Sequence, residues 1–521
     1  MKKLTTIFSV FAFAAAVANA ADIDLIYTSP NAKGEAKWFD KSSWGTTEHP
    51  SNLPPSDNAM AARFEWDFQH LYLDRDTTMS YLTLNRDIGA KTSTPTLSLY
   101  NPETKAETNL TFDISQNVAA GASSVDIIKG HDGSRGFNAK VDSMNFIFDG
   151  GTINITDSSE GNTGTRTANI LIKPENNDVD FSGKTYSYTF NSNVVSTENL
   201  YIEGKSASNK AGGVFKVEFN KELSLVNGSD YKTLTLGNTK DVYKVDAAGN
   251  MTAAGLAVVI GKEATANVGK FKVGENAFLQ VDGVLNTNTA GNEFATGSQT
   301  VINGTWNYFG HNELYGRLEI KGEARRTGGD PFINLRKNSE LVIDGKNKGD
   351  IQFLTGIRMF GGGKLVINSD SLDAGTNIWI PYGSVGNENH IEVNASTKLN
   401  SFRFGNNTST IITFADDAIL ILAEFSSGNG DGWVHELTSN ELLTLVNYEN
   451  GKIRCTSDMT KDNKNDLSVI RADGFEDGSF KWELGFDGTY WLVGTAVPEP
   501  AAVAAIFGLA ALGFALYRRR R

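Results

Sequence analysis

The sequence predicts an all-β fold, a right-handed parallel β-helix (β-solenoid) closed by capping strands, with one helix at each end of the 521-residue chain. Short runs of residues alternate between apolar and polar side chains, which is the pattern of strands with one buried face. Gly, Asn or Asp follows many of these runs, as at residues 279–283, 318–322 and 341–345. The runs also recur at a nearly regular interval, which indicates a structural repeat.

The repeat is visible in the first apolar residues of seven successive strands. They are Val258, Leu279, Val301, Leu318, Leu341, Leu365 and Ile391. The steps between them average about 22 residues. This length suits one coil of a parallel β-helix, in which coils stack at about 4.8 Å and the inward side chains form one continuous core. Residues 130–445 are therefore expected to form the β-solenoid, roughly 14 coils and on the order of 65 to 70 Å long.

Gly and Asn between the strands fit the corners of such coils, because these residue types tolerate the left-handed backbone conformation. Stacked Asn side chains can also form hydrogen bonds from coil to coil. The alternative is a fold of β-sandwich domains, which would also read as many short strands separated by turns. The interval near 22 residues and the scarcity of tight Asn-Gly loops favour the solenoid.

Residues 1–20 have the features of a secretory signal peptide with a short signal helix. Two lysines precede an apolar run, and the small residues Ala18 and Ala20 stand before Ala21, where signal peptidase would cut. The apolar run is short for a membrane span. We therefore expect an exported protein, with signal peptidase as its first processing partner.

Residues 21–129 are expected to form the N-terminal β segment that starts and caps the solenoid. Trp38 and Trp44 lie near its beginning and are followed by a turn rich in Pro, Asp and Asn. This spacing resembles the opening segment of autotransporter-like exported passenger proteins. The two indoles are expected to cover the first coil, and the alternative is a platform that stacks against sugar rings.

Residues 446–496 are expected to form a C-terminal β cap. The last two strands of this segment read as a β-hairpin with its turn at Asp487 and Gly488. A solenoid needs such a cap, because its open end otherwise exposes unpaired backbone groups to other chains.

Residues 497–521 carry three linked features in a fixed order. They are the motif Pro498, Glu499 and Pro500, the uncharged stretch 501–517, and the terminal cluster Arg518, Arg519, Arg520 and Arg521. A helix of this length reaches roughly 26 Å, the lower edge of what crosses a bilayer core, so 501–517 is predicted to be a transmembrane helix. The arginines would keep the C-terminus in the cytoplasm and leave the preceding chain outside.

This order resembles the PEP-CTERM sorting signal of Gram-negative bacteria. The resemblance implies that a membrane-embedded, exosortase-like enzyme recognises Pro498, Glu499 and Pro500 and removes the helix, while the terminal arginines hold the tail in the inner membrane. The membrane anchor through 501–517 would then be transient. The resemblance also implies a cell that makes exopolysaccharide, which becomes a candidate partner. These residues are acted upon and bring no activity of their own.

The charge pattern disfavours nucleic acid as a partner of the body. The formal net charge is −13, and the first 20 residues carry two lysines and residues 501–521 four arginines. Residues 21–500 therefore hold 42 basic and 61 acidic side chains. A body so acidic repels polyanions over most of its surface.

No motif indicates a reaction, a cofactor or a metal site. The six histidines are scattered, and neither a nucleophile elbow nor a phosphate-binding loop is present. Residues 462–466 have an Asp at the first and fifth positions, as in a calcium loop, but Lys464 stands at the third and the Gly and Glu that complete the loop are missing, so a polar surface loop is expected. The single cysteine, Cys455, cannot form an intramolecular disulfide and is expected to be a small buried residue.

Carboxylates from neighbouring coils can meet on a solenoid surface without any signal in the linear sequence. The candidates, which lie about one coil apart, are Glu319, Glu323, Glu340, Asp344, Asp370 and Asp373. The simpler interpretation is that they are solvent-facing side chains of an acidic protein.

We therefore expect an exported, non-enzymatic cell-surface or extracellular-matrix protein that acts through stiffness and many weak contacts. The alternative is a carbohydrate-active β-helix enzyme, a polysaccharide lyase or glycoside hydrolase, in which carboxylates and a base converge in a groove. A third interpretation is a sugar-binding module with Trp306, Tyr308 and Phe309 as first candidates. Alternation places Trp306 and Tyr308 on one face of their strand, and the competing interpretation is that this face points into the core.

Overall fold

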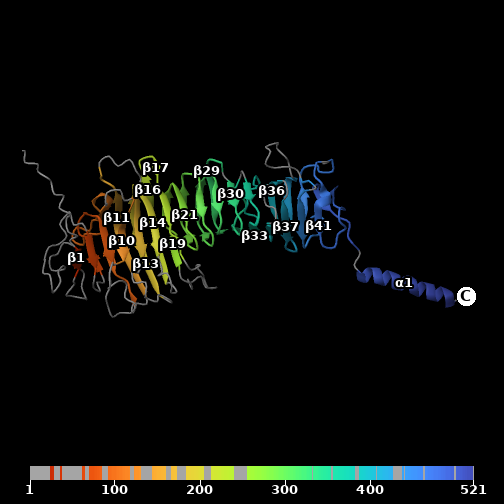
Figure 1. The fold of residues 1–521 in the computed structure, drawn as a ribbon, viewed down its shortest axis with the longest axis horizontal. Coiled ribbons are helices and arrows are strands. Elements are labelled where there is room, and N and C mark those ends of the chain that lie inside the picture. Colours follow the sequence, from red (N-terminus) through yellow and green to blue (C-terminus); the bar gives the residue numbers. More distant parts are fainter. Residues whose placement is uncertain are drawn as a thin grey trace, which may run out of the picture.

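The computed structural model describes most of the chain from residue 70 onward, together with three short strands before it. The described residues are 24–27, 36–37, 61–64, 70–84, 92–117, 123–130, 143–159, 166–172, 184–204, 213–239, 255–330, 332–353, 356–381, 387–405, 408–425, 437–438, 440–461, 464–497 and 500–519. In Figure 1 they form an elongated rod of stacked strands, with the helix α1 (Pro500–Arg519) leading away from the C-terminal end.

The strands of the rod lie on three faces, and the strands of each face pair in parallel from one coil to the next. The first face consists of β1 (Asp24–Tyr27), β3 (Ala61–Phe64), β6 (Tyr81–Leu84), β10 (Ser124–Gly130), β12 (Thr167–Ile172), β14 (Asn199–Gly204), β18 (Thr233–Leu236), β21 (Lys270–Val273), β24 (Asn292–Phe294), β27 (Asn312–Leu314), β30 (Phe332–Leu335), β32 (Gly356–Met359), β34 (Asn377–Ile380), β36 (Thr397–Phe404), β38 (Leu420–Phe425) and β40 (Ile453–Cys455).

The second face is built in the same way. It consists of β2 (Ala36–Lys37), β4 (His70–Tyr72), β8 (Thr96–Ser98), β11 (Ser143–Thr156), β13 (Thr185–Ser196), β15 (Val214–Phe219), β19 (Gly255–Ile260), β22 (Phe278–Val281), β25 (Gln299–Ile302), β28 (Arg317–Ile320), β31 (Glu340–Ile343), β33 (Lys364–Ile367), β35 (Asn389–Val393), β37 (Ser409–Phe414), β39 (Leu442–Val446) and β41 (Ile470–Ala472), and β7 (Thr92–Ser93) pairs with β11 beside it.

The third face is shorter, and the long strands β11 and β13 bend to run through both the second and the third face. It consists of β5 (Thr77–Met79), β9 (Asn109–Asp113), the C-terminal halves of β11 and β13, β16 (Leu223–Asn227), β20 (Thr265–Val268), β23 (Val284–Thr287), β26 (Thr305–Phe309) and β29 (Glu323–Gly328). Such parallel stacking confirms the predicted all-β parallel β-helix and excludes the β-sandwich alternative, whose sheets are antiparallel.

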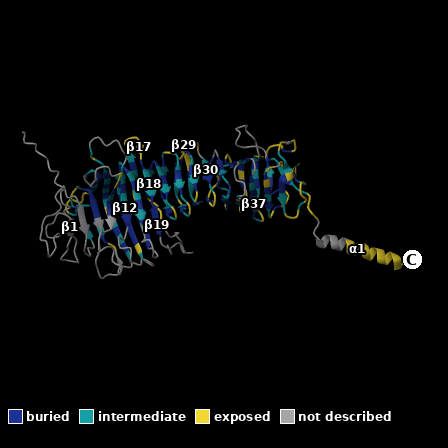
Figure 2. Cartoon of the chain, viewed as in Figure 1, coloured by how far each residue is buried: buried dark blue, intermediate teal, exposed yellow. Residues whose placement is uncertain are grey.

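The core is a continuous ladder of inward side chains in register. On the second face Phe190 stacks between Phe148 and Phe219, with ring centroids 4.8 and 5.1 Å apart and the rings almost parallel. The same ladder continues through Ile260, Val281, Ile302, Ile320, Ile343, Ile367, Val393 and Phe414. Figure 2 shows buried residues along the whole body, so the core lengthens with each coil and does not thicken.

The predicted repeat is confirmed, with a correction of one residue in its third strand. Leu279 pairs with Thr300, and Thr300 with Leu318, so Thr300 occupies the ladder position that was assigned to Val301. Val301 faces outward and packs against Ala257 and Phe278 on the outer side of the second face. Because Val301 is apolar although it faces outward, the sequence pattern predicted the register of this strand wrongly by one residue. A shift of one residue exchanges the inward and outward faces of a strand.

Left-handed residues stand at the corners between the first and second faces, as expected. Asn276, Gly297 and Asn338 have φ values of 60°, 73° and 64°. At the corner between the third and first faces a buried amide ladder forms, in which Asn292 Nδ2 donates to Asn312 Oδ1 at 2.8 Å and Asn292 Oδ1 accepts from the Phe271 N–H at 3.0 Å. These bonds satisfy polar groups in the interior, which would otherwise destabilise the stack.

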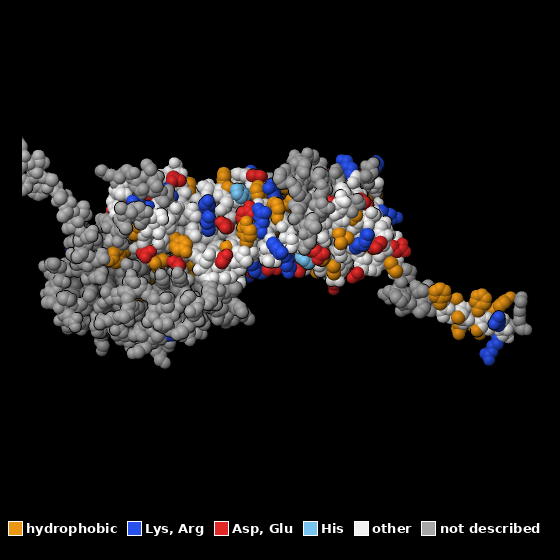
Figure 3. Space-filling model, in the orientation of Figure 1, with side chains coloured by type: hydrophobic (Ala, Val, Ile, Leu, Met, Phe, Trp, Pro, Cys, Tyr) orange, Lys and Arg blue, Asp and Glu red, His pale blue; other side chains and the backbone are white. Residues whose placement is uncertain are grey.

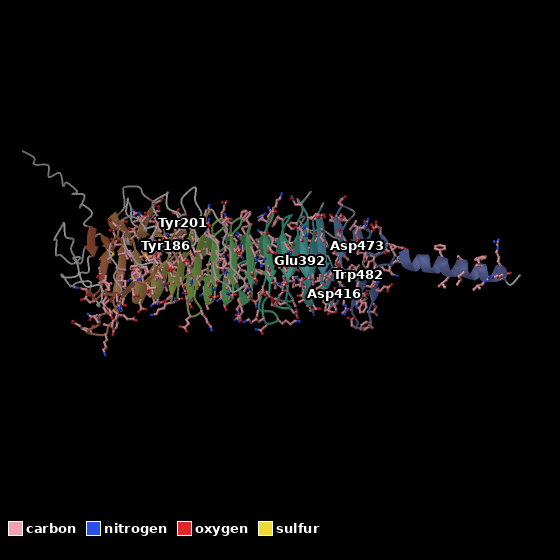
Figure 4. All side chains as sticks on the ribbon, turned by 90° about the horizontal axis from the view of Figure 1, so that it is seen from below. Tyr186, Tyr201, Glu392, Asp416, Asp473 and Trp482 are labelled. Carbon is pink, nitrogen blue, oxygen red and sulfur yellow. The ribbon has the colours of Figure 1, made fainter. Side chains whose placement is uncertain are left out.

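The predicted hairpin closes the C-terminal end. β42 (Lys481–Leu484) and β43 (Tyr490–Val493) are antiparallel, and Gly488 in the turn between them has a φ of 79°. β43 also pairs in antiparallel fashion with β40, so the hairpin covers the end of the first face. Trp482 packs on Phe425 with ring centroids 5.4 Å apart and lies in the C-terminal part of the rod in Figure 4.

The parallel ladders continue on both sides of residues 130 and 445, so the strands beyond these positions stack on the same body. Cys455 is buried in β40, as expected. The predicted signal peptide 1–20 and the indoles of Trp38 and Trp44 lie outside the described residues.

Candidate functional site

The C-terminal tail is one helix, α1, which begins at Pro500 and ends at Arg519. Proline suits the first turn of a helix, because its fixed φ is helical and no backbone N–H is needed there. Large apolar side chains of α1 are exposed, with Phe507 at 71% and Phe514 at 74%. The basic residues Arg518 and Arg519 occupy the last turn, where a positive charge interacts favourably with the helix dipole.

The helix agrees with the predicted stretch 501–517, extended by one residue at its start and two at its end. Within the part of the chain that the structure describes, no helix combines the length and apolar character needed to cross a membrane. The transmembrane assignment therefore stays a prediction. Several predicted processing and anchoring residues lie outside the described residues, namely Ala18, Ala20, Ala21, Pro498, Glu499, Arg520 and Arg521.

The candidate carboxylates on the second face form ion pairs with basic side chains of the same coil or of an adjacent coil. Arg317 contacts both Glu319, at 3.3 Å, and Glu340. Lys364 lies 3.4 Å from Glu340 and 2.9 Å from Glu392, and the hydrogen bond to Glu392 raises the pKa of Lys364. Opposite charges thus alternate from coil to coil, and Figure 3 shows basic and acidic side chains interspersed over the middle of the rod.

The remaining candidate residues make contacts through their carboxylates or, for Asp344, through the backbone. Glu323 pairs with Arg325 at 2.8 Å, and Asp370 pairs with Lys348 at 2.9 Å. Asp373 Oδ1 accepts from the backbone N–H of Gly375 at 2.7 Å. Asp344 donates its backbone N–H to the Ile320 carbonyl at 2.9 Å, which ties the loop after β31 to the coil before it. Among the described residues, no group of three or more His, Cys, Asp and Glu side chains is arranged to hold a metal ion.

The aromatic residues proposed as a sugar platform do not form one. Trp306 and Tyr308 are both 0% exposed, and their ring centroids lie 4.9 Å apart inside the core. Tyr308 donates to the carbonyl of Gln352, and burial raises the pKa of its hydroxyl. Only Phe309 of the three reaches the surface, because alternation along β26 turns it outward. The sugar-binding interpretation of Trp306 and Tyr308 was therefore wrong.

An arginine–aromatic column runs along the outer side of the first face, and sequence reasoning missed it. It consists of Phe332, Arg358, Trp379 and Arg403, from β30, β32, β34 and β36. The guanidinium carbon of Arg358 lies 3.6 Å from the centre of the Phe332 ring and 4.6 Å from that of Trp379. Arg403, one coil further, lies 5.0 Å from the centre of the Trp379 ring. The only signal in the sequence is the spacing of Arg358, Trp379 and Arg403, each about one coil from the next.

A glycine makes room for the indole of this column. A Cβ on Gly356 would lie 3.2 Å from both Cδ1 and Nε1 of Trp379 and 3.1 Å from the Asn377 carbonyl oxygen. Its φ of 138° is also one that residues with a side chain rarely adopt. Gly356 therefore allows Trp379 to lie close against the sheet.

A shallow hollow lies beside the column, at the corner between the first and second faces. Its lining is polar and consists of Lys337, Asn338, Gly362, Asn387, Glu388, His390 and Ser409. Ser409 Oγ donates to Glu388 Oε1 at 3.3 Å.

The comparison with known families identifies the tail. Residues 496–521 match the PEP-CTERM protein-sorting motif. This motif marks an exported protein that an exosortase sorts to the cell surface, so the resemblance of the C-terminus is confirmed. No curated protein and no solved structure matches the chain. The autotransporter-like resemblance of the N-terminal segment stays a prediction.

Proposed function

We propose that the chain is a non-enzymatic protein of the cell surface or extracellular matrix, delivered by its C-terminal sorting signal and associated with exopolysaccharide. The observation that carries this proposal is the sorting motif at residues 496–521, which ends in an exposed apolar helix followed by arginines. The body attached to this motif is a long parallel solenoid, a shape that offers a stiff and extended surface.

The tail would act in two steps. The helix α1 would hold the precursor at the inner membrane, with the arginines after residue 517 on the cytoplasmic side. An exosortase-like enzyme would then recognise Pro498, Glu499 and Pro500 and separate the body from the helix. The arginine cluster keeps the helix from following the body outward, because moving charged side chains through a bilayer is unfavourable.

The absence of catalysis is part of the proposal, and the surface chemistry of the second face supports it. Two of the carboxylates that were candidates for catalysis, Glu319 and Glu340, are paired with Arg317 and Lys364. Carboxylates that are engaged in ion pairs do not form the open group of carboxylates and a base that a lyase or hydrolase requires. The body would instead work through stiffness and repeated weak contacts along its length.

Mass spectrometry of the mature C-terminus tests the sorting step. We expect surface protein from wild-type cells to lack the residues after the motif, and the triple variant Pro498→Ala, Glu499→Ala, Pro500→Ala to keep Arg521 and stay with the membrane fraction. The matched control is Lys481→Ala, Glu483→Ala on the cap hairpin, an exposed ion pair outside the motif, which should be processed normally. An intact Arg521 on wild-type surface protein would contradict the proposal.

A further inference from the structure

We propose that the arginine–aromatic column of the first face binds a linear polysaccharide that carries carboxylate groups. The site is Phe332, Arg358, Trp379 and Arg403 on the outer side of β30, β32, β34 and β36. The inference deepens the proposed function and rests on it, since it requires the body to stand outside the cell beside such a polymer.

The column holds the Arg358 guanidinium in one orientation. It lies between the Phe332 and Trp379 rings, and its Nε is buried. A ligand therefore meets the terminal Nη edge of the group, which presents two parallel N–H donors and matches a carboxylate. Because stacking already restricts the side chain, less conformational entropy is lost when a ligand binds.

The charged groups around the column are compatible with the binding of an additional anion. Among the described residues, Arg358 pairs with the carboxylate of Asp330, whose Oδ2 lies 4.0 Å from Arg358 Nη2 and whose side chain is 61% exposed. Glu313 is engaged elsewhere, since it accepts from Arg336 Nε at 2.8 Å and from Asn334 Nδ2 at 2.5 Å. Glu424 lies beyond the column, in register with Ser401. An exposed pair at 4.0 Å is weak, so a ligand carboxylate can replace Asp330.

A second stacked arginine widens the basic strip. The guanidinium carbon of Arg336 lies 4.2 Å from the centre of the Phe360 ring, beside the column on the same face. Lys337 follows it and lines the neighbouring hollow. Because Arg336 is paired with Glu313, the excess positive charge of this region comes from Arg358, Arg403 and Lys337. This local excess on a body that is acidic overall favours anionic ligands.

The spacing of the arginines favours a linear polymer over a small anion. Arg358 and Arg403 stand two coils apart, with Trp379 between them, which is roughly 9.6 Å along the rod axis. This distance is comparable to two sugar rings of an extended polysaccharide. A polysaccharide with a carboxylate on every second ring would contact both arginines. Once the first carboxylate is bound, the second is held close to its arginine at a high effective concentration, which increases the overall affinity.

The same geometry disfavours single-stranded nucleic acid. Proteins bind such strands by stacking bases on open aromatic faces. Here Arg358 and Arg403 cover the indole of Trp379 from the coils on either side, and Arg358 also covers the Phe332 ring. The guanidinium edges, and not the aromatic faces, are the groups that a ligand meets.

Binding of polygalacturonate to the purified full chain tests the proposal, with its methyl ester as the uncharged comparison polymer. We expect wild-type protein to bind polygalacturonate, more weakly as salt rises, and to bind the ester far less. The double variant Arg358→Gln, Arg403→Gln should lose affinity by about tenfold per arginine. The matched control is Arg325→Gln, Arg471→Gln, which removes the same charge from other faces and should bind like wild type.

The variant Asp330→Asn keeps the test decisive should the arginine variants fail to fold. It removes the competing carboxylate at an exposed position and should bind polygalacturonate several-fold more tightly. The proposal would be overturned if wild-type protein did not bind polygalacturonate, bound the ester equally well, or preferred a single-stranded oligonucleotide. It would also be overturned if the control variant lost as much affinity as the double arginine variant. Because C-terminal processing is read separately by mass, a failure here leaves the sorting step standing.

Discussion

Arg454 and Asp487 join the last coil of the solenoid to its cap, with Arg454 Nη1 2.6 Å from Asp487 Oδ2. Arg454 belongs to β40, and Asp487 lies in the turn of the hairpin that covers it. The guanidinium carbon of Arg454 also lies 4.5 Å from the centre of the Trp491 ring, and Trp491 Nε1 donates to Asp487 Oδ1 at 3.0 Å. The three side chains therefore form one contact that holds the cap closed.

Replacing Asp487 with Asn should loosen this cap. The change removes the charge that Arg454 contacts, and we expect the free energy of unfolding to fall by about 1 kcal/mol. Hydrogen exchange should rise in β40, β42 and β43 and stay unchanged in the middle of the rod. The control is Glu483→Gln, which breaks the exposed pair with Lys481 and should have almost no effect. Equal effects of the two variants would contradict this role for Asp487.

The contribution of Asp487 should depend on pH in a defined direction. Hydrogen bonds from Thr489, then from Trp491, and the charge of Arg454 lower the pKa of Asp487 from 3.8 to about 2. A carboxyl group whose pKa is lower in the folded state stabilises that state above its unfolded pKa and loses the effect as pH falls through the folded value. The difference in melting temperature between wild type and Asp487→Asn should therefore be constant above about pH 5 and shrink towards pH 2. A difference that grows on acidification would contradict the assignment.

Phe190 is the centre of the stacked ring ladder, and its removal should open the solenoid locally. Phe190→Ala leaves a cavity between Phe148 and Phe219, and we expect a loss of about 3 to 5 kcal/mol. Because coils contact only their neighbours, the loss should appear as faster hydrogen exchange in β11, β13 and β15. Phe309→Ala, at a surface position, is the control and should change stability by less than about 1 kcal/mol. A uniform loss of protection along the rod would show that the coils unfold together.

Thr300 interrupts the apolar ladder of the second face, and replacing it with Val should stabilise the protein. Its side chain is 0% exposed, and within the described residues its hydroxyl has no hydrogen-bond partner. Val has nearly the same shape without a polar group to bury, so we expect a gain of about 1 kcal/mol in thermal or denaturant unfolding. The control is Thr305→Val, on the outer side of the third face, where the hydroxyl contacts Glu323 at 3.3 Å. A loss of stability in Thr300→Val would indicate that the hydroxyl is hydrogen-bonded in solution.

The architecture could be predicted because it depends on the order of residue types along the chain. Alternation in each strand and a return every 22 or so residues specify stacked coils, and the left-handed Asn276 and Asn338 confirm the expected corners. The hairpin at Asp487 and Gly488 follows from turn chemistry that is equally local. The prediction was wrong at Val301 because one strand carries apolar residues on both sides, and alternation alone does not select the inner one.

The linear sequence therefore determined the features that depend on residues close together in the chain. These features are a solenoid of short strands, a capping hairpin and a sorting tail. The tertiary structure decided which side chains meet across coils. Arg317 contacts Glu340 of the next coil, and Arg358 stacks on Trp379. Loops of unequal length separate these residues, so only the hydrogen-bonded register of the parallel strands brings them side by side.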